Sequence, residues 1–505
     1  MSHVPATIKL NRSQQGAFDK IQEFLLQSKY SEFYLIGHAG TGKTLLTSSL
    51  VKNLLVEKKV DQVFILAPTH KALNVIESYI RADLSKSKID QNRYTDQLSF
   101  VTIHKFLEVK PVIMADTGEK VFRSARESKF VKQLNRKLII IDECSMISSP
   151  MVSEMAKYTE VYPVHIMYIG DPQQLPPVSE ECSSVFTRIP KNYRYAVTLT
   201  KIMRTRDNDI RSVCHTIREW DMKSKLLGSL VEIFENSEIG TFKLFNHKEN
   251  IENSSWFKSF LKCVDNGGKI PIILTWRNQI SDKYNLLIRG VLHNTKDLIQ
   301  YLQNDLIMFN NFYHSPFTES TFYTSNMLRI TSVVSETRQL CDWNRISTPK
   351  SISGVEKEYN RIVRKLAKIP VAFKIDLIEG TRVYNNLDNI SDRSKHKIQT
   401  VSRASVDEYE AMKKIVREEI SAFYHKTHAD KVASHLWDFF YKNISDPFAE
   451  INFGHSLTVY KSQGSTFDIV YVDFTDLETI NNIQDFKKAL YTAAGRASTQ
   501  LCLIV

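Results

Sequence analysis

The sequence predicts an α/β protein with two parallel β-sheets and a large insertion of different character in the second sheet. Seven short apolar runs end at Gly, Pro, Asp or Thr, which is typical of strands buried on both faces of a parallel sheet. Polar, helix-compatible stretches separate the runs, as βαβ units require. The runs are residues 33–36, 63–66, 138–141, 165–169, 272–274, 469–472 and 501–505.

The first four runs lie close together in the chain and are assigned to one sheet; the last three are assigned to a second sheet. The segment between the fifth and sixth runs changes character. Residues 304–334 alternate as short strands and predict a small antiparallel barrel, whereas residues 355–368 and 404–425 predict helices. Residues 385–403 are polar and basic and predict a loop.

A smaller interruption covers residues 108–130. The sequence VKPVIMADTGEKVF has Asp-Thr-Gly at its centre between apolar residues, which predicts a β-hairpin.

Composition limits the class of protein. The chain has 505 residues, which at roughly 150 per domain gives about three or four domains. A net charge of +11 indicates a polyanionic partner, either nucleic acid or an anionic membrane face, or else serves solubility alone. Six cysteines without a CxxC pair argue against disulfides or zinc. No signal peptide or membrane-spanning run is found, so we expect a protein of the cytoplasm, nucleus or a viral replication site.

Residues 37–44 read GHAGTGKT and match the phosphate-binding pattern GxxxxGK[ST] between an apolar run and a helical stretch. Glycines let the backbone N–H groups face phosphate oxygens. A lysine supplies charge to the β- and γ-phosphates, and the hydroxyl that follows it binds Mg²⁺. The expected nucleotide-binding residues are Gly37, Gly40, Thr41, Gly42, Lys43 and Thr44, with Thr44 also a metal ligand.

The run LIIIDE ends in two acids, as the partner of such a loop should. We expect Asp142 to hold Mg²⁺, through water, and Glu143 to orient and deprotonate the attacking water. The alternative is a solvated strand end with no catalytic role.

Nine further segments, in order along the chain, resemble the motifs of superfamily 1B helicases, specifically the RecD-like group that includes Dda-type enzymes. They are LNRSQQGAF (10–18), APTHKA (67–72), TIHKFL (102–107), DECSM (142–146), GDPQQLPPV (170–178), LTKIMR (199–204), TWRNQISDKYN (275–285), SLTVYKSQGST (456–466) and LYTAAGRA (490–497). The chain departs from the family at Tyr460, where His is usual, and at Gly495, where Thr is usual; both put only fine loop contacts in doubt.

The resemblance implies further roles at the nucleotide. Gln14 would read the adenine edge, Gln174 would sense the γ-phosphate, and Gly464 would contact the nucleotide. Arg204 and Arg496 would be arginine fingers; without their motifs, either would be read as a surface salt bridge.

The resemblance also implies a set of nucleic-acid contacts, mostly to phosphate and sugar, for which simple solvent exposure is the alternative. Phe122 on the hairpin would stack on the base pair at a fork, or else pack the hairpin. Trp437 lies in the region of the family's hook, and we expect it to pack in a core. The other implied contacts are Pro68, Thr69, His70, His104, Thr275, Asn278 and Thr458.

By the same resemblance, the fold would be two RecA-like P-loop motor domains with two insertions. The first motor domain would be residues 1–200, with the hairpin (domain 1B) inside it. The second would be residues 201–300 and 445–505. Residues 301–444 would be domain 2B, an SH3-like barrel with a helical hook.

The implied function is an ATP- and Mg²⁺-dependent DNA helicase of replication or repair that moves 5′ to 3′. Its partners would be single-stranded DNA and fork duplex, with no membrane; it would work as a monomer beside replication proteins. Three alternatives stay open: an RNA helicase, a DNA-stimulated translocase that displaces proteins without unwinding, and a binding module with a decayed motor. Intact Lys43, Glu143 and Arg496 argue against the last.

Overall fold

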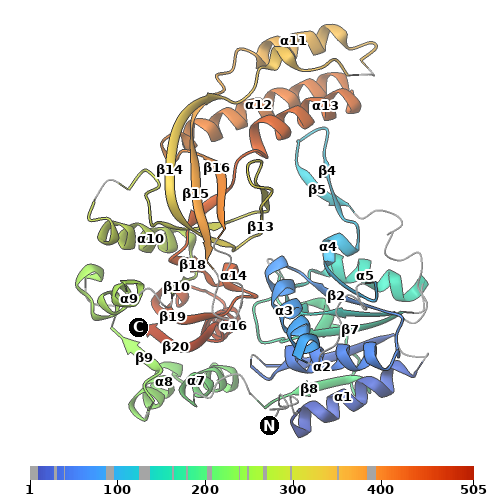
Figure 1. Ribbon diagram of the computed structural model, residues 1–505, viewed down its shortest axis with the longest axis vertical. Coiled ribbons are helices and arrows are strands. Elements are labelled where there is room, and N and C mark those ends of the chain that lie inside the picture. Colours follow the sequence, from blue (N-terminus) through green and yellow to red (C-terminus); the bar gives the residue numbers. More distant parts are fainter. Residues whose placement is uncertain are drawn as a thin grey trace.

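The protein forms two lobes of parallel sheet, with a third body above the second lobe (Figure 1). No helix within the described ranges is long and apolar enough to cross a membrane. The computed structural model describes residues 10–27, 31–38, 40–86, 96–123, 137–161, 164–177, 180–201, 208–237, 239–246, 250–265, 270–295, 298–349, 352–383 and 394–505.

The first lobe is built on a six-stranded parallel sheet. Side chains alternate across it: Phe33 and Leu35 face one core, and Tyr34 between them faces the other. Helices α1 (Arg12–Leu25), α2 (Lys43–Val56) and α3 (His70–Lys86) cover the first face, and α5 (Ser149–Val161) covers the second. The strand order is β3 (Leu98–Thr102), β2 (Gln62–Ala67), β6 (Lys137–Ile141), β7 (Val164–Gly170), β1 (Glu32–Gly37) and β8 (Ala196–Leu199).

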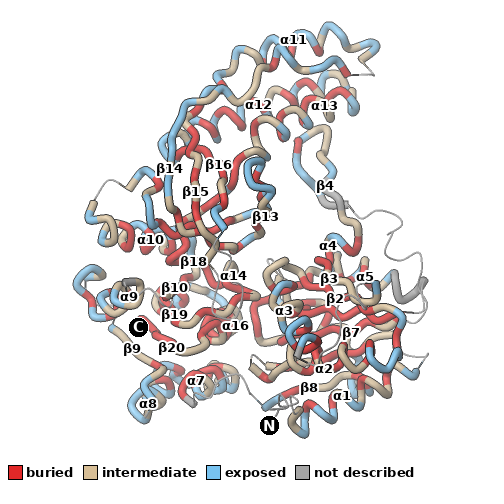
Figure 2. Tube along the Cα trace, in the orientation of Figure 1, coloured by how far each residue is buried: buried red, intermediate tan, exposed pale blue. Residues whose placement is uncertain are grey.

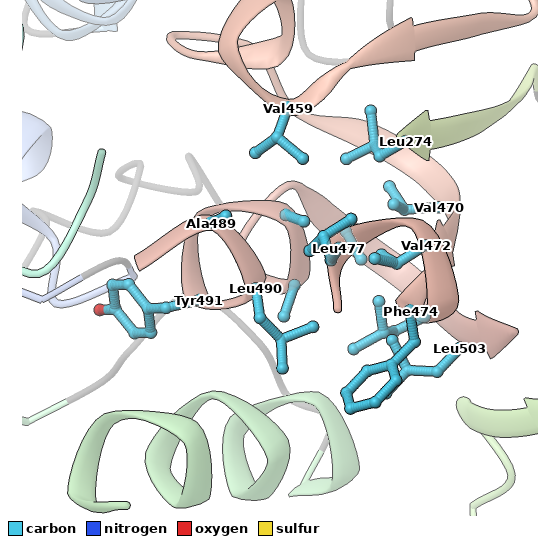
Figure 3. Close-up of a cluster of buried hydrophobic side chains, with 14 of the residues drawn as sticks. Leu274, Val459, Val470, Val472, Phe474, Leu477, Ala489, Leu490, Tyr491 and Leu503 are labelled. Atoms are coloured by element: carbon cyan, nitrogen blue, oxygen red, sulfur yellow. The ribbon is translucent and has the colours of Figure 1, made fainter. Parts of the chain in front are cut away.

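The second lobe repeats this plan with five parallel strands. One face packs against α7 (Asn208–Glu219), α8 (Leu226–Glu235) and α16 (Ile483–Ala494), the cluster drawn in Figure 3. The other face packs against α9 (Ser255–Asp265) and α10 (Asn278–Leu292). The strand order is β18 (Ser456–Thr458), β10 (Pro271–Thr275), β19 (Phe467–Asp473), β20 (Ala497–Ile504) and β9 (Phe242–Phe245).

These two sheets confirm all seven predicted strands and their division into two groups. Four strands escaped the prediction, and each lies at the edge of a sheet: β3 and β8 in the first, β18 and β9 in the second. Edge strands need less apolar sequence than central ones, and β8 is for the most part only half-buried. In Figure 2 the central strands of both lobes are the buried ones.

The third body contains a five-stranded antiparallel sheet, which we call the insert sheet. Its pairing confirms the antiparallel strands expected for residues 304–334. A hydrogen bond from Ala449 N to Gln399 O (2.8 Å) draws its two edges together, while closure as an SH3-like barrel stays a prediction. The order is β16 (Lys395–Val401), β15 (Ala372–Val383), β14 (Met327–Gln339), β11 (Leu306–Phe309) and β17 (Ile451–Phe453).

The loop prediction for residues 385–403 is wrong over β16. His396 and residues 398–401 of this strand are buried, whereas Lys395 is exposed. The buried residues include His, Gln and Thr, so the strand does not form an apolar run in the sequence. Residues 384–393 lie outside the described residues.

Above the insert sheet lie three helices, α11 (Glu356–Leu366), α12 (Val406–Thr427) and α13 (Asp430–Phe440) (Figure 1). The first two confirm the helices expected from sequence. The hairpin expected around Asp-Thr-Gly is also confirmed: β4 (Lys110–Ile113) pairs antiparallel with β5 (Lys120–Arg123). It rises from the first lobe and ends beneath α13 (Figure 1).

Candidate active site and nucleic-acid interface

The phosphate-binding loop joins β1 to α2 at the carboxyl edge of the first sheet. Gly40 and Gly42 have φ of 80° and 81°, a region that favours glycine. Lys43 Nζ donates to the loop carbonyls of Gly37 (2.6 Å) and His38 (3.3 Å). The lysine charge is therefore held inside the curl of the loop, where phosphate oxygens are expected.

Gln14 lies in the first turn of α1 and is 1% exposed. Its amide Oε1 accepts from Asn11 N (3.0 Å), and its Nε2 donates to Thr41 O (3.1 Å). A Cβ at Gly42 would come within 2.5 Å of this Nε2. Gln14 thus supports the phosphate-binding loop; its contact with adenine stays a prediction.

Two acids occupy the strand ends beside the loop. Asp142 follows β6, and burial together with the neighbouring Glu143 raises the pKa of Asp142 to about 7, against the opposing charge of Lys43. Glu143 has φ of 52°, an uncommon backbone for this residue type. Asp171 follows β7, between the strands that carry the loop and Asp142.

Asp171 was not expected from sequence, although it stands in GDPQQLPPV. Burial acts to raise the pKa of Asp171, but His38 (Nδ1–Oδ1 3.8 Å), Lys43 and the Tyr491 hydroxyl outweigh it and lower the pKa. Asp171 is therefore a buried carboxylate that is ionised at neutral pH. It interacts with His38 of the phosphate-binding loop and with the charge of Lys43.

A divalent cation fits the charge of the side chains beside this loop. Asp142 and Glu143 bring two carboxyls together, and burial disfavours the charged form of Asp142 unless a cation balances it. Among the described residues no group of three or more His, Cys, Asp or Glu side chains forms a complete metal site. A Mg²⁺ ion there would complete its shell with phosphate oxygens and water, as this ion commonly does.

Four hydrogen bonds beside the phosphate-binding loop and the strand-end acids join the first lobe to the second; we call them the polar joint. Arg496 Nη2 donates to Gln174 Oε1 (3.2 Å), and Tyr491 OH donates to Asp171 Oδ2 (2.8 Å). Figure 3 shows Tyr491 pointing from α16 away from the other labelled side chains. The remaining two are Leu175 N to Thr492 Oγ1 (3.0 Å) and Gln463 Nε2 to Leu175 O (2.9 Å).

The polar joint brings together Gln174 and Arg496, which are far apart in sequence. Arg496 is 4% exposed and also donates to the carbonyls of Thr492 and Ser465, so the surface salt bridge considered above is wrong for it. Arg204, the other expected finger, lies outside the described residues.

The expected nucleic-acid residues of the first lobe lie at or just after strand ends. Pro68, Thr69 and His70 join β2 to α3, and Thr69 Oγ1 accepts from Ala72 N (3.2 Å) to cap the helix. Burial, with the charge of Lys105, lowers the pKa of His70; burial alone lowers that of His104, in helix α4 (Ile103–Phe106). Both imidazoles are therefore neutral at neutral pH.

The residues from the second lobe differ in accessibility. Asn278, at the start of α10, is exposed. Thr275 and Thr458 are buried; Thr275 donates to Arg277 O (3.2 Å) and so shapes the turn after β10. Asp476 fixes the same turn by accepting from Trp276 N (2.7 Å) and from Arg277 N (3.0 Å), a role that sequence reasoning missed.

Gly464, expected at the nucleotide, lies against the first turn of α3. Its φ is 70°, and a Cβ there would be 3.6 Å from Thr69 Oγ1 and 3.5 Å from Ala72 Cβ. The segment after β18 therefore lies against Thr69 and the first turn of α3. The contact of Gly464 with the nucleotide stays a prediction.

The hairpin contacts the helices of the third body; we call this set the hairpin joint. Trp437 Nε1 donates to Ala115 O (3.0 Å), and Tyr441 OH donates to Gly118 O (2.5 Å). Lys120 Nζ pairs with Asp446 (2.8 Å). Trp437 is 0% exposed, so it packs in a core and also holds the hairpin.

Phe122 is on β5, opposite Pro111 in register. Its side chain lies outside the described part of the structure, so its stacking at a fork stays a prediction.

Comparisons with known proteins agree with this geometry. The AAA domain family matches residues 22–180, and the UvrD-like helicase C-terminal domain family matches residues 453–504. "Uncharacterized protein R530" of Acanthamoeba polyphaga mimivirus is 41% identical over 495 residues, which cover 98% of this chain and 99% of that protein.

Two other similarities are more distant. The RecBCD enzyme subunit RecD of Mycolicibacterium smegmatis is 28% identical over 146 residues, 28% of this chain and 24% of the subunit, so the match spans about a quarter of RecD. The crystal structure of Bacteroides Pif1 bound to ssDNA has 15% identity and a TM-score of 0.46, over 99% of this chain and 93% of that one. The full-length relative shows that the chain belongs to one family with the mimivirus protein. The two parallel sheets and the matched AAA and UvrD-like helicase C-terminal domains show an ATP-driven helicase of the RecD-like group of superfamily 1B.

Proposed function

We propose that this enzyme hydrolyses ATP with Mg²⁺ to move 5′ to 3′ along single-stranded DNA, and that it separates duplex DNA at the hairpin. The polar joint is the observation that carries the proposal. It links the carboxyl edge of the first sheet, beside the phosphate-binding loop, to α16 of the second lobe. Nucleotide chemistry and the relative position of the lobes are thereby coupled.

At the nucleotide, each side chain has a distinct task. Lys43 neutralises the β- and γ-phosphates, and Glu143 orients the attacking water and takes its proton. Thr44 and Asp142 would hold Mg²⁺, which neutralises the charge that develops on the phosphates. Gln174 senses the γ-phosphate and holds Arg496 at the same time.

Arg496 acts as an arginine finger from the second lobe, with Arg204 as the other. A finger contributes about 10³- to 10⁵-fold in rate when it reaches the γ-phosphate. Because Arg496 reaches across the polar joint, the rate depends on how close the lobes are. Hydrolysis then alternates with closure, and each closure moves the strand-binding residues of one lobe relative to the other.

The strand would lie over the residues 68–70, His104, Asn278 and Thr458. Contacts of this type go to phosphate and sugar, so binding is expected to be independent of sequence. The net charge of +11 supports a polyanionic partner.

The hairpin joint supports strand separation. A hairpin that splits base pairs must resist the force of the fork, and three side chains from the third body hold this one. We further propose that the enzyme works as a monomer beside replication proteins, with the domain boundaries expected from sequence. The 5′-to-3′ direction rests on the family resemblance.

The decisive test measures ATP hydrolysis with and without single-stranded DNA, for the wild type and Lys43→Ala. Stimulation by DNA that is lost in the variant is the expected result. Strand displacement on 5′- and 3′-tailed duplexes, of DNA and of RNA, then sets direction and substrate. A rate of ATP hydrolysis that neither DNA nor RNA changes would overturn the proposal. Stimulation by DNA without strand displacement would indicate a translocase that does not unwind.

A further inference from the structure

Two aromatic side chains of the third body lie over the strand-end residues of the first lobe. The ring of Tyr323 stacks on that of His70, with centroids 3.7 Å apart and planes 21° apart. Phe312 follows at 5.7 Å from Tyr323 and is 63% exposed. Both belong to the excursion between β11 and β14 that carries β12 (Tyr313–His314) and β13 (Thr321–Phe322).

Neither ring is needed for the core of the insert sheet. Their neighbours Tyr313 and Phe322 are buried in that core, where Phe322 stacks on Phe309 at 4.2 Å. Tyr323 is only half-buried and Phe312 is exposed, and neither belongs to the buried cluster. The chain therefore holds two large aromatic rings outside this core, Phe312 facing outward and Tyr323 against His70, next to residues expected to hold a strand.

The turn that carries Tyr323 is held in place. Tyr323 N donates to Asn326 Oδ1 (2.8 Å), and Asn326 N donates back to Tyr323 O (2.9 Å). Ser325 Oγ donates to Lys461 O (3.0 Å), and Lys461 Nζ donates to Asn310 Oδ1 (3.3 Å). The ring is thus fixed relative to the segment after β18, and Gly464 of that segment lies against Thr69.

Three segments meet at this place: residues 68–70, the segment after β18, and the turn with Tyr323. Lys105 and Lys461 add positive charge, and Lys105 lies close enough to help lower the pKa of His70. Aromatic faces beside cations are the usual means of holding single strands, because every base has a flat face and every nucleotide a phosphate.

We propose that Tyr323 and Phe312 form a base-stacking platform for single-stranded nucleic acid, and that a base takes the face of Tyr323 now covered by His70. This inference rests on the proposed function, since it assumes that a strand lies over residues 68–70. The platform should accept purines and pyrimidines alike, because stacking reads no base edge.

The test measures binding of a labelled oligo-dT strand to the full chain by fluorescence anisotropy. Stacking on one ring contributes enough that Tyr323→Ala should weaken binding about five- to 100-fold, and Tyr323→Phe should bind like the wild type. Phe234→Ala is the matched control, because Phe234 is 40% exposed on α8, far along the chain from the platform. Wild-type-like binding by Tyr323→Ala would overturn the platform alone; a wild type that binds no strand would overturn the proposed function.

A second strand separates stacking from a general loss of structure. In this strand the sugar–phosphate backbone is intact but the bases are absent. Loss of the bases should weaken binding by the wild type at least about fivefold more than binding by Tyr323→Ala, since the variant has already lost the stack. Equal losses in both proteins would mean that Tyr323 only supports the fold, and would overturn the inference.

Discussion

The polar joint and the hairpin joint both connect the first lobe to the rest of the molecule, but they are built from different chemistry. The polar joint consists of hydrogen bonds between side chains and loops beside the phosphate-binding loop, with the ionised Asp171 among them. The hairpin joint places a buried Trp437 and a Tyr441 hydroxyl on backbone carbonyls of the hairpin tip.

This difference indicates which joint moves. The polar joint includes a carboxylate and a guanidinium, Asp171 and Arg496, which a triphosphate and its cation repel or attract. In the hairpin joint the buried Trp437 and the Tyr441 hydroxyl donate to neutral backbone carbonyls, and the one charged pair, Lys120–Asp446, lies between the hairpin and the third body rather than beside the phosphate-binding loop. We therefore expect the polar joint to open and close during the cycle while the hairpin joint stays closed.

The largest expected effect is on Arg496. Arg496→Ala should lower kcat for DNA-stimulated ATP hydrolysis about 10³-fold or more, because an arginine finger is lost. Strand separation should fall in proportion. Arg345→Ala is the control, since this arginine is exposed on the third body. A kcat for Arg496→Ala within about tenfold of the wild-type value would show that the polar joint does not supply the arginine finger.

Gly118→Ala should break the hairpin joint. Gly118 has φ of 69°, and a Cβ would lie 2.4 Å from the ring of Trp437. Strain in the left-handed region alone costs about 1 kcal/mol, or about fivefold, and the overlap with Trp437 adds to it. Strand separation should therefore fall about fivefold or more while DNA-stimulated hydrolysis persists.

Gly228→Ala is the matched control for Gly118→Ala, because nothing lies within 4 Å of a Cβ at that helical position. It should leave both activities unchanged. If Gly118→Ala kept full strand separation, the contact between the hairpin and α13 would have no role at the fork.

Two tyrosine hydroxyls give the smallest and most closely matched comparison. Tyr491→Phe removes a hydrogen bond to a buried carboxylate and should slow hydrolysis about tenfold; Tyr441→Phe removes one to a neutral carbonyl and should slow only strand separation, about threefold. Steady-state hydrolysis and displacement of a 5′-tailed duplex measure the two effects. Equal losses of hydrolysis in both variants would contradict the division between the joints.

The sequence was a good guide to elements whose signal is local. Three kinds of element can be recognised within about ten residues: central strands, the phosphate-binding loop and the Asp-Thr-Gly hairpin. Their signals are burial, positive φ and turn chemistry, which all act locally. β16 was missed because polar His, Gln and Thr stand among its buried residues, so they do not form an apolar run.

Contacts between distant segments could not be read in the same way. Nothing local to GDPQQLPPV indicates that Asp171 accepts from Tyr491, or local to TWRNQ that Asp476 fixes the turn after β10. The motifs predicted that Gln174 and Arg496 serve one nucleotide, but only the fold brings them together in the polar joint. The roles of the individual site residues stay predictions for the experiments above.

The most direct test of the whole account is the number of ATP molecules hydrolysed per base pair separated, measured on a 5′-tailed DNA duplex. Gly118→Ala should raise this ratio while hydrolysis stays near the wild-type rate, and Arg496→Ala should lower both activities with little change in the ratio. A Gly118→Ala protein that is folded yet loses hydrolysis and strand separation together would contradict the claim that the two joints serve separate steps.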